Sequence, residues 1–390
     1  MTLNNLFIDF NSYFASVEQQ IKPELRNKPV GVVPVMADTT CCIAASYEAK
    51  AFGVKTGTMV SEAKKLCPGI KLVEANHRTY IEYHENLKKT IETCLPIDNV
   101  VSIDEMVCSL YGNEKKRENA VKIALNIKQK IKENVGEYLR SSIGIAPNQF
   151  LAKTGTNLQK PDGLVVIEEK DLPDILYKLP LNDLTGVGRR MIVRLNRNNI
   201  FTMKNLCAAD KNKLREIWGG IEGDRMYDQL RGKFVKRPPT HRSTVGHSHV
   251  LPPKLKNNES AYAVLDRLLQ KAAMRLRYLK YYAGAVGISV RYKTPSISES
   301  ENSFYKTETN YWNYNKTKWK DYENFTHTQN TTEFLKALNI LWQRNPFLNK
   351  SFFDEKYIPT AVGVVLFNLL HQDYSTLHIF ENFEKNKSLY

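Results

Sequence analysis

Three carboxylates interrupt two apolar segments that are typical of buried β-strands. Asp9 lies within residues 6–10, and Asp104 and Glu105 lie within residues 100–107. An unpaired buried carboxylate is costly, so such a residue usually accepts hydrogen bonds, forms a salt bridge or holds a cation. Successive side chains of a regular strand point to opposite faces. We therefore expect the second strand to end or bend near Asp104, so that all three carboxylates meet if the two strands are neighbours.

Such a group of carboxylates predicts phosphate chemistry. Carboxylates are hard oxygen ligands that suit Mg²⁺, which also keeps waters and substrate phosphates in its shell. Two such ions about 4 Å apart activate a hydroxyl nucleophile and neutralise a leaving pyrophosphate in an in-line displacement. Either segment alone would be explained as well by an ordinary salt-bridged carboxylate. The two segments together favour a site for two metal ions.

The elements that must position these carboxylates alternate between strands and helices over the first 167 residues. After the first strand we expect a helix from about Ser12, two short strands and two short helices within 28–75, a β-rich segment at 99–111, a helix at 114–133, a strand at 141–146 and a helix whose first residue is Pro147. This β-α-β-β-α-β order predicts a ferredoxin-like sheet with a smaller inserted region.

The rest of the chain divides at a proline-rich segment. Residues 168–232 are expected to form short helices, and residues 236–239, Lys-Arg-Pro-Pro, indicate a linker. A second β-α-β-β-α-β pattern follows it. Its expected strands are 241–250, 283–292, 303–312 and 358–367, and its expected helices are 258–280 and 331–343.

Positive charge is concentrated in this second half. The 390 residues carry 56 Lys and Arg against 41 Asp and Glu, for a net charge of +15. Residues 231–293 hold fourteen of the basic residues and only two acidic ones, which indicates a surface that binds a polyanion such as nucleic acid. No segment approaches the roughly 18 apolar residues of a membrane span. The six cysteines show no Cys-x-x-Cys spacing, which favours reduced thiols in a cytoplasmic protein over a zinc site or disulfides.

Residues 6–15, 45–54 and 102–105 together resemble a Y-family DNA polymerase, especially its bacterial DNA polymerase IV branch. The resemblance implies an α+β, multidomain right-hand polymerase. Its expected domains are a ferredoxin-like palm (1–12 and 76–167), small fingers (13–75), a helical thumb (168–232), a linker (233–240), a little finger (241–368) and a C-terminal tail (369–390).

The resemblance also implies roles for individual residues. The catalytic residues are Asp9, Asp104 and Glu105, which would bind two Mg²⁺ ions together with the Phe10 carbonyl. The positions that would bind the incoming dNTP are Tyr13, Phe14, Tyr47, Lys50 and Lys160. Phe14 stands where the family has a steric gate against the 2′-hydroxyl of ribonucleotides. Many relatives have Arg where this chain has Lys50, so the contact with the triphosphate is expected to differ there.

DNA is expected to bind at two places. Gly186 and Gly188, followed by Arg189 and Arg190, resemble the hairpin of a helix-hairpin-helix, in which backbone amides approach a DNA phosphate. In the little finger, Arg242 and Arg291 would contact the DNA backbone. The basic residues of the helix 258–280 either line the same groove or face solvent; these are Arg267, Lys271, Arg275 and Arg277.

The tail loosely resembles a peptide that binds a sliding clamp. Leu377, Ile379 and Phe380 would be the anchors, but Gln372 lies too far from them for the common form. A tail with incidental apolar residues is the alternative. The other expected partners are primer–template DNA and a dNTP, with no membrane, and we expect a monomer.

The resemblance implies a template-directed DNA polymerase of low fidelity that copies past damaged bases. One alternative is a catalytically weak relative that binds DNA and recruits other proteins to damage. Another is a different two-metal enzyme on a similar sheet, such as a nuclease or a nucleotide cyclase. The presence of all three carboxylates disfavours the first alternative, and the steric-gate position, the hairpin and the basic fourth domain disfavour the second.

Overall fold

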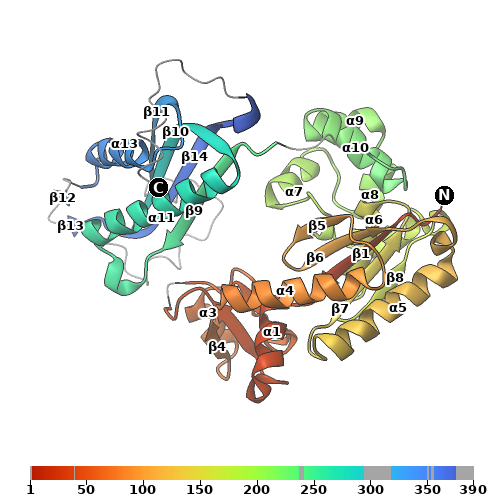
Figure 1. The fold of residues 1–390 in the computed structure, drawn as a ribbon. Coiled ribbons are helices and arrows are strands. Elements are labelled where there is room, and N and C mark those ends of the chain that lie inside the picture. Colours follow the sequence, from red (N-terminus) through yellow and green to blue (C-terminus); the bar gives the residue numbers. More distant parts are fainter. Residues whose placement is uncertain are drawn as a thin grey trace. The chain divides into compact units, whose positions relative to one another are not determined.

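The computed structural model describes residues 2–38, 40–236, 241–293, 318–348, 351–352 and 355–374 (Figure 1). The chain divides into two units, Met1–Pro238 and Pro239–Tyr390, and each unit has its own sheet and its own core. Within the described ranges, no helix combines the length and the apolar character that a membrane span requires. The expected linker 233–240 surrounds the boundary between the units, and its residues 237–240 lie outside the described part.

A five-stranded sheet forms the centre of the first unit. Its strands are β1 (Asn5–Phe10), β5 (Asn99–Ser102), β6 (Glu105–Ser109), β7 (Ser141–Ala146) and β8 (Leu164–Val166), in the order β5-β6-β1-β7-β8. Strand β1 is antiparallel to both of its neighbours, and β8 is parallel to β7. Strands β5, β6, β1 and β7 have the order of a ferredoxin-like sheet, as predicted. The expected β-rich segment 99–111 is a hairpin that bends at Ile103 and Asp104.

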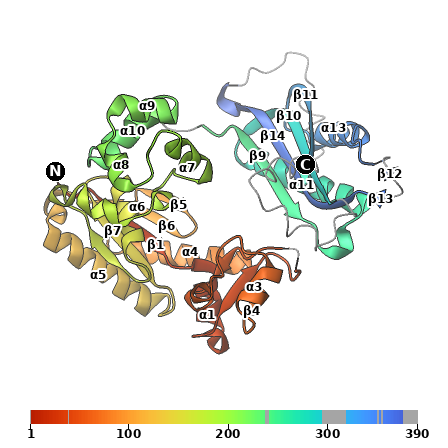
Figure 2. The ribbon, with the colours of Figure 1, turned by 180° about the vertical axis from the view of Figure 1, so that it is seen from behind.

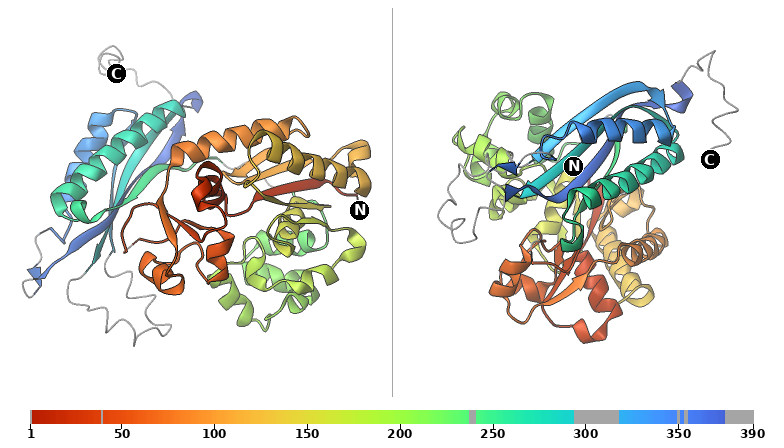
Figure 3. Two further views of the ribbon diagram at one scale, coloured as in Figure 1. Left: turned by 90° about the horizontal axis from the view of Figure 1, so that it is seen from below. Right: turned by 90° about the vertical axis from the view of Figure 1, so that its left-hand side faces the viewer.

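Helices cover both faces of this sheet (Figure 3). Leu6 and Ile8 point into a core shared with α4 (His77–Glu92) and α5 (Arg117–Asn134). Phe7 points to the other face, where α6 (Gln149–Leu158) lies. Because side chains alternate along a strand, Asp9 faces α6 together with Phe7.

The start of α6 differs from the prediction. Pro147 is not its first residue, because the Asn148 side chain caps the helix by accepting a hydrogen bond from the Leu151 amide at 2.8 Å. Pro147 therefore precedes the cap, a position that needs no helical hydrogen bond. The helix lies very close to β7: a Cβ atom on Gly144 would be 1.9 Å from the Ala152 carbonyl oxygen, so only glycine permits this approach.

The inserted region begins with α1 (Tyr13–Ile21) and contains a small three-stranded sheet. Its strands β2 (Val30–Val33), β3 (Ala44–Ala45) and β4 (Lys71–Glu74) have the order β3-β2-β4. The two expected short strands and two expected short helices are present, the helices being α2 (Tyr47–Ala51) and α3 (Val60–Leu66). Strand β4 was not predicted, because its four residues, Lys-Leu-Val-Glu, show no alternation of apolar and polar side chains.

Residues 168–232 form short helices, as predicted. They are the 3₁₀ turns η3 (Glu169–Asp171), η4 (Asp174–Lys178) and η5 (Leu181–Asp183), followed by α7 (Arg189–Asn196), α8 (Met203–Ala208), α9 (Lys211–Trp218) and α10 (Ile221–Leu230). Their apolar side chains share one core with Phe7 and with α6.

The second unit has the predicted β-α-β-β-α-β chain order. Its main elements are β9 (Thr244–Val250), α11 (Asn258–Tyr278), β10 (Tyr281–Lys293), β11 (Lys318–Thr328), α13 (Thr331–Gln343) and β14 (Ile358–His371), and the sheet order is β11-β10-β14-β9. The strand expected at 303–312 lies outside the described residues, and the strand that follows β10 in the described chain and pairs with it is β11. Helix α11 lies in front of the sheet in Figure 1 and behind β9 and β14 in Figure 2.

Candidate active site and nucleic-acid interface

Two of the three predicted carboxylates lie directly opposite each other on neighbouring strands. Asp9 of β1 pairs with Glu105 of β6 in the strand register, so both side chains face α6. The Lys153 ammonium, from α6, forms ion pairs with both, and its nitrogen is 2.6 Å from the Glu105 carboxylate. Lys160 adds a second ion pair with Asp9 at 2.9 Å. Two lysines thus balance a carboxylate that is only 6% exposed.

Lys153 is a site residue that the sequence did not reveal. Burial by itself would lower the pKa of its ammonium, but the charges and hydrogen bonds of Asp9 and Glu105 raise that pKa above its ordinary value. A signal existed, because Lys153 is the one charged residue in α6, within a stretch of small and apolar residues. A single lysine in a helix is more often solvated, so this signal alone was too weak.

Asp104 follows the bend between β5 and β6. Its side chain accepts a hydrogen bond from the Ser102 hydroxyl at 2.6 Å, and its carbonyl oxygen accepts one from the Phe10 amide at 2.9 Å. Burial raises the pKa of Asp104, the Ser102 hydrogen bond opposes this, and the charges of Asp9 and Glu105 raise it further. Asp104 lines the same cavity as Asp9. Among the described residues, no three acidic, His or Cys side chains are arranged as a metal centre.

A cavity of about 250 Å³ opens beside Asp9 and Asp104. Segments far apart in the sequence form its walls. Seven of the predicted site residues line it, namely Asp9, Asp104, Phe10, Tyr13, Phe14, Lys50 and Lys160. Tyr47 and Glu105 are not among its lining residues, and each instead contacts a lysine. The lining of the cavity thus combines carboxylates, aromatic rings and cations.

The cationic wall combines Lys50 with Lys160. Ser46 caps α2 by accepting a hydrogen bond from the Ala49 amide, and this places Tyr47 and Lys50 on one side of the helix. The Lys50 ammonium lies 4.4 Å from the centre of the Tyr47 ring. Burial and the charge of Lys160 lower the pKa of Lys50, although Asp9 opposes this. Burial and the charge of Asp9 raise the pKa of Tyr47 to about 12. This wall suits a bound anion.

Tyr80, which the sequence did not single out, supports the Phe14 ring in the lining of the cavity. The Phe14 ring stacks on the Tyr80 ring, with centroids 4.4 Å apart and planes 17° apart. The Tyr80 hydroxyl donates to Glu18 at 2.8 Å, and the Tyr13 hydroxyl donates to the Tyr80 carbonyl at 2.7 Å. Phe14 is thus supported from behind and cannot easily swing away from the cavity.

The predicted hairpin at 184–190 has buried anchors and an exposed tip. Leu184 and Val187 are buried, whereas Gly186, Gly188 and both following arginines are exposed. Gly186 has φ +87°, a conformation that favours glycine, and no heavy atom lies within 4 Å of a Cβ built on either glycine. Helix α7 begins here without a side-chain cap and without an acidic residue in its first turn.

In the second unit, helices cover one face of the sheet, and no helix of the described ranges covers the other, which we call the open face. Val286, Ile288 and Val290 of β10 belong to the core beneath α11 and α13. The alternate residues therefore point to the opposite face. Near one end of that open face, the register groups Arg291, Ser289, Lys318, Lys320, Ala361, Gly363 and Ser248.

Three cations dominate this end of the open face. Arg291 pairs directly with Lys318, and Lys320 lies two residues further along β11. Burial, followed by the charges of Lys320 and Arg291, lowers the pKa of Lys318. The sequence predicted Arg291 but missed both lysines, because the strand that carries them was expected elsewhere. Arg242 is exposed just before β9.

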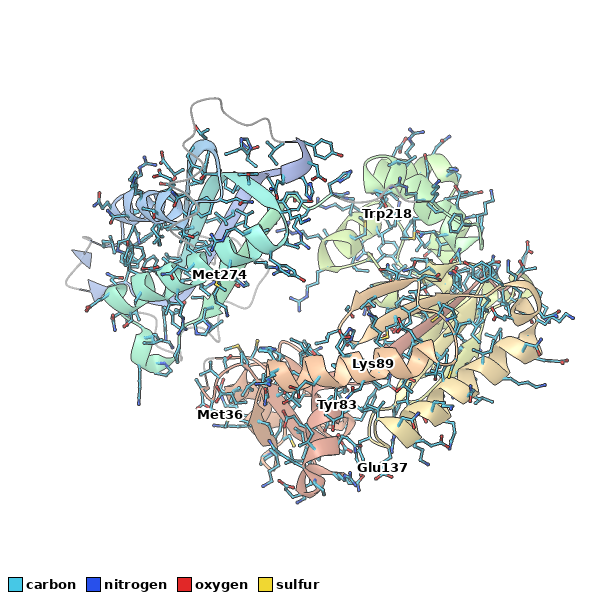
Figure 4. All side chains as sticks on the ribbon, viewed as in Figure 1. Met36, Tyr83, Lys89, Glu137, Trp218 and Met274 are labelled. Atoms are coloured by element: carbon cyan, nitrogen blue, oxygen red, sulfur yellow. The ribbon has the colours of Figure 1, made fainter. Side chains whose placement is uncertain are left out.

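The basic residues of α11 lie on the helical side of the unit. Arg267, Lys271 and Arg275 are exposed there, as is Met274, which is labelled on this helix in Figure 4 and is 64% exposed. Arg277 has a structural contact: its guanidinium donates to the Gln329 carbonyl at 3.1 Å and to the Thr331 hydroxyl at 2.9 Å. The cations of α11 and those of the open face therefore lie on different sides of the sheet.

The end of the described chain is anchored to this unit. The Gln372 amide donates to the Lys280 carbonyl at 2.8 Å, and the description ends at Tyr374. Leu377, Ile379 and Phe380, the anchors expected for a sliding clamp, lie outside the described residues.

Comparisons with known proteins agree over both units. The model of the impB/mucB/samB family matches residues 8–157, and that of the impB/mucB/samB family C-terminal domain matches residues 242–378. DNA polymerase IV of Moorella thermoacetica is 33% identical over 292 residues, which are 73% of this chain and 72% of that protein. DNA polymerase IV 1 of Bacillus subtilis is 30% identical over 335 residues, which are 79% of this chain and 78% of that protein.

Solved structures share the fold at lower identity. A Y-family DNA polymerase chimera of Dbh and Dpo4 has a TM-score of 0.73 at 21% identity, with 94% of this chain and 99% of that chain covered. DinB from Sulfolobus solfataricus has a TM-score of 0.55 at 22% identity, with the same coverage. With the carboxylate-bearing sheet and the α+β architecture described above, these matches show that the chain belongs to the Y family of DNA polymerases.

Proposed function

We propose that this Y-family polymerase extends a primer 3′-hydroxyl with dNTPs opposite a template strand, including damaged templates, with low fidelity. The observation that carries the proposal is the cavity beside Asp9 and Asp104, whose lining combines the cations Lys50 and Lys160 with the Phe14 ring that stacks on Tyr80. This combination suits a deoxynucleoside triphosphate held next to a carboxylate site. Relatives named DNA polymerase IV support the same activity.

The carboxylates fit divalent cations, as the family implies. Lys153 already places a cation between Asp9 and Glu105, so this position favours positive charge, and the donors are hard oxygens. We propose that Asp9, Asp104, Glu105 and the Phe10 carbonyl hold Mg²⁺. When bound, the ions supply charge neutralisation for the triphosphate and activation of the primer hydroxyl. Lys153 would give up part of its contact with the carboxylates on binding.

The remaining residues of the cavity would bind and orient the nucleotide. Lys50 and Lys160, with Tyr47 beside them, would hold the triphosphate. Lys50 is a point charge, so it would position the phosphates less rigidly than the bidentate fork of an arginine. Phe14, held by its stacking on Tyr80, would lie against the sugar and leave no room for a 2′-hydroxyl.

Two surfaces would hold the primer–template backbone. The hairpin offers exposed backbone at Gly186 and Gly188, and the uncapped start of α7 with Arg189 and Arg190 follows it. The open face of the second unit offers Arg291, Lys318 and Lys320 above small residues. We accordingly propose the domain names palm (1–12 and 76–167), fingers (13–75), thumb (168–232) and little finger (241–368). Clamp binding through the tail, a monomeric state and a cytoplasmic location stay predictions, and six free thiols agree with the last.

Removing the Asp104 carboxylate tests the proposed activity. Asp104→Ala should reduce the rate of primer extension with Mg²⁺ and dNTPs by roughly 10³-fold, because several kcal/mol of charge stabilisation is lost. Binding of primer–template, measured by fluorescence anisotropy, should stay within about twofold. Asp98→Ala, which removes an exposed carboxylate from the same region, serves as the control. An Asp104→Ala protein as fast as the wild type would contradict the catalytic proposal.

Replacing Lys153 tests how the carboxylates bind cations. In EDTA, Lys153→Met should lower the free energy of unfolding by about 3 kcal/mol, because the buried Asp9 carboxylate and the half-buried Glu105 carboxylate lose their shared partner. Added Mg²⁺ should then raise the melting temperature of the variant more than that of the wild type, since no ammonium has to be displaced. Lys122→Met, an exposed lysine on α5, is the control. An equal Mg²⁺ effect in both proteins would show that Lys153 and the cation do not compete.

Truncating Phe14 tests the sugar contact. Phe14→Ala should lower the ratio of kcat/KM for dNTPs over rNTPs by roughly 100-fold, mainly through faster use of rNTPs. Single-nucleotide incorporation with matched dNTP and rNTP measures this ratio. Tyr111→Ala removes an aromatic ring that is 67% exposed and should leave the ratio unchanged. Sugar discrimination that survives in Phe14→Ala would remove the assignment.

Variants on the two sides of the second unit's sheet test which side binds the DNA backbone. Replacing both Lys318 and Lys320 by Ala should reduce the slope of log K against log salt by about 1.8, or about 0.9 for each lost phosphate contact. The matched control replaces Arg267 and Lys271 of α11 by Ala and should change the slope little. If the control variant loses more of the salt dependence, the phosphate-binding surface is the helical side instead.

A further inference from the structure

Lys160 sits in a turn that buried polar side chains hold in place. The turn, residues 159–163, joins α6 to β8. The Asp162 amide donates to Oδ1 of Asn11 at 2.7 Å. Nδ2 of Asn11 in turn donates to the Ser142 hydroxyl at 3.1 Å. Asn11 is 2% exposed and Ser142 is fully buried, so these hydrogen bonds form where water does not compete.

Ser142 ties the turn on both sides of Lys160. Its hydroxyl donates to the Gln159 carbonyl at 3.1 Å and accepts a hydrogen bond from the Gly163 amide at 3.3 Å. The turn is also closed tightly, because a Cβ atom on Gly163 would be 2.0 Å from the Gln159 carbonyl oxygen. The backbone before and after Lys160 is therefore fixed to one side chain of β7.

Lys128 fastens the same turn from α5. Its ammonium donates to the Ser141 carbonyl at 2.6 Å and to the Asp162 carbonyl at 2.8 Å, and it forms an ion pair with the Asp162 carboxylate at 2.6 Å. The three protons of the ammonium are thus used, and the side chain is 16% exposed. Three separate elements hold this turn: the segment after β1, strand β7 and helix α5.

These contacts connect the turn to the carboxylate site. Asn11 lies two residues after Asp9. The Asp9 carboxylate forms an ion pair with the Lys160 ammonium, with 2.9 Å between the oxygen and the nitrogen. The same short segment therefore fixes both the carboxylate and the backbone that carries the lysine. Because the backbone that carries Lys160 is already fixed, only the rotamer freedom of its side chain remains to be lost when the ammonium is held on a ligand.

We propose that Asn11, Ser142 and Lys128 are positioning residues that set nucleotide affinity through Lys160 without touching the nucleotide. This inference rests on the proposed contact between Lys160 and the triphosphate. The structural alternative is that these polar groups only satisfy one another in the fold. In that case their removal would lower stability, but it would leave the KM for dNTP unchanged in the folded enzyme.

A double-mutant cycle with Lys160 tests the inference. Lys128→Met should raise the KM for dNTP about tenfold and change kcat less than twofold, because the lysine loses its fixed origin but the carboxylates stay in place. Lys160→Ala should raise KM at least as much. The double variant should match Lys160→Ala alone. Lys132→Met, an exposed lysine one helical turn further along α5, is the control and should leave KM unchanged.

Asn11→Ala repeats the test at a buried member of the same hydrogen-bond network. Urea unfolding verifies that this variant is folded. If it does not fold, Lys128→Met alone decides the question. An unchanged KM in Lys160→Ala would defeat the proposed triphosphate contact itself. A raised KM in Lys160→Ala together with an unchanged KM in Lys128→Met would falsify only the positioning inference. Equal effects of Lys128→Met with and without Lys160 would also overturn it, because the effect would then not pass through that lysine.

Discussion

The opposition of Asp9 and Glu105 across two antiparallel strands is the constraint on which the rest of the first unit depends. Directly opposed like charges destabilise a sheet, and these two sit in a largely buried place. Positive charge must therefore come from a neighbouring element. Helix α6 supplies Lys153, and the turn that follows it supplies Lys160. The close approach of α6 to Gly144 brings the helix that carries Lys153 next to the sheet.

The cavity divides its tasks among segments that meet only in the folded chain. The end of β1 and the β5–β6 bend supply negative charge, the inserted region supplies Phe14 and Lys50, and the turn after α6 supplies Lys160. Each of these side chains is supported by a neighbour: Phe14 by Tyr80, and Lys50 by the Tyr47 ring. Rigid support of this kind lets a small site hold a flexible, highly charged molecule in one geometry.

Much of this could be predicted from the sequence, and the misses have physical reasons. The alternating pattern predicted both chain orders, and carboxylates inside apolar strands were visible because burial of charge is rare. Lys153 and Tyr80 were missed because their importance lies in contacts across more than sixty residues of chain. Lys318 and Lys320 were missed because a cation belongs to a face only once its strand is correctly placed. Pro147 was misplaced because Asn148 is the better cap.

The open face of the second unit has a further consequence. Between its cations lie Ser248, Ser289 and Gly363, none of which has a side chain long enough to interlock with a groove. In the proposed DNA complex, the long cationic side chains reach the phosphates, while the short side chains between them cannot read a base edge. The same grip would therefore hold any sequence that passes through it.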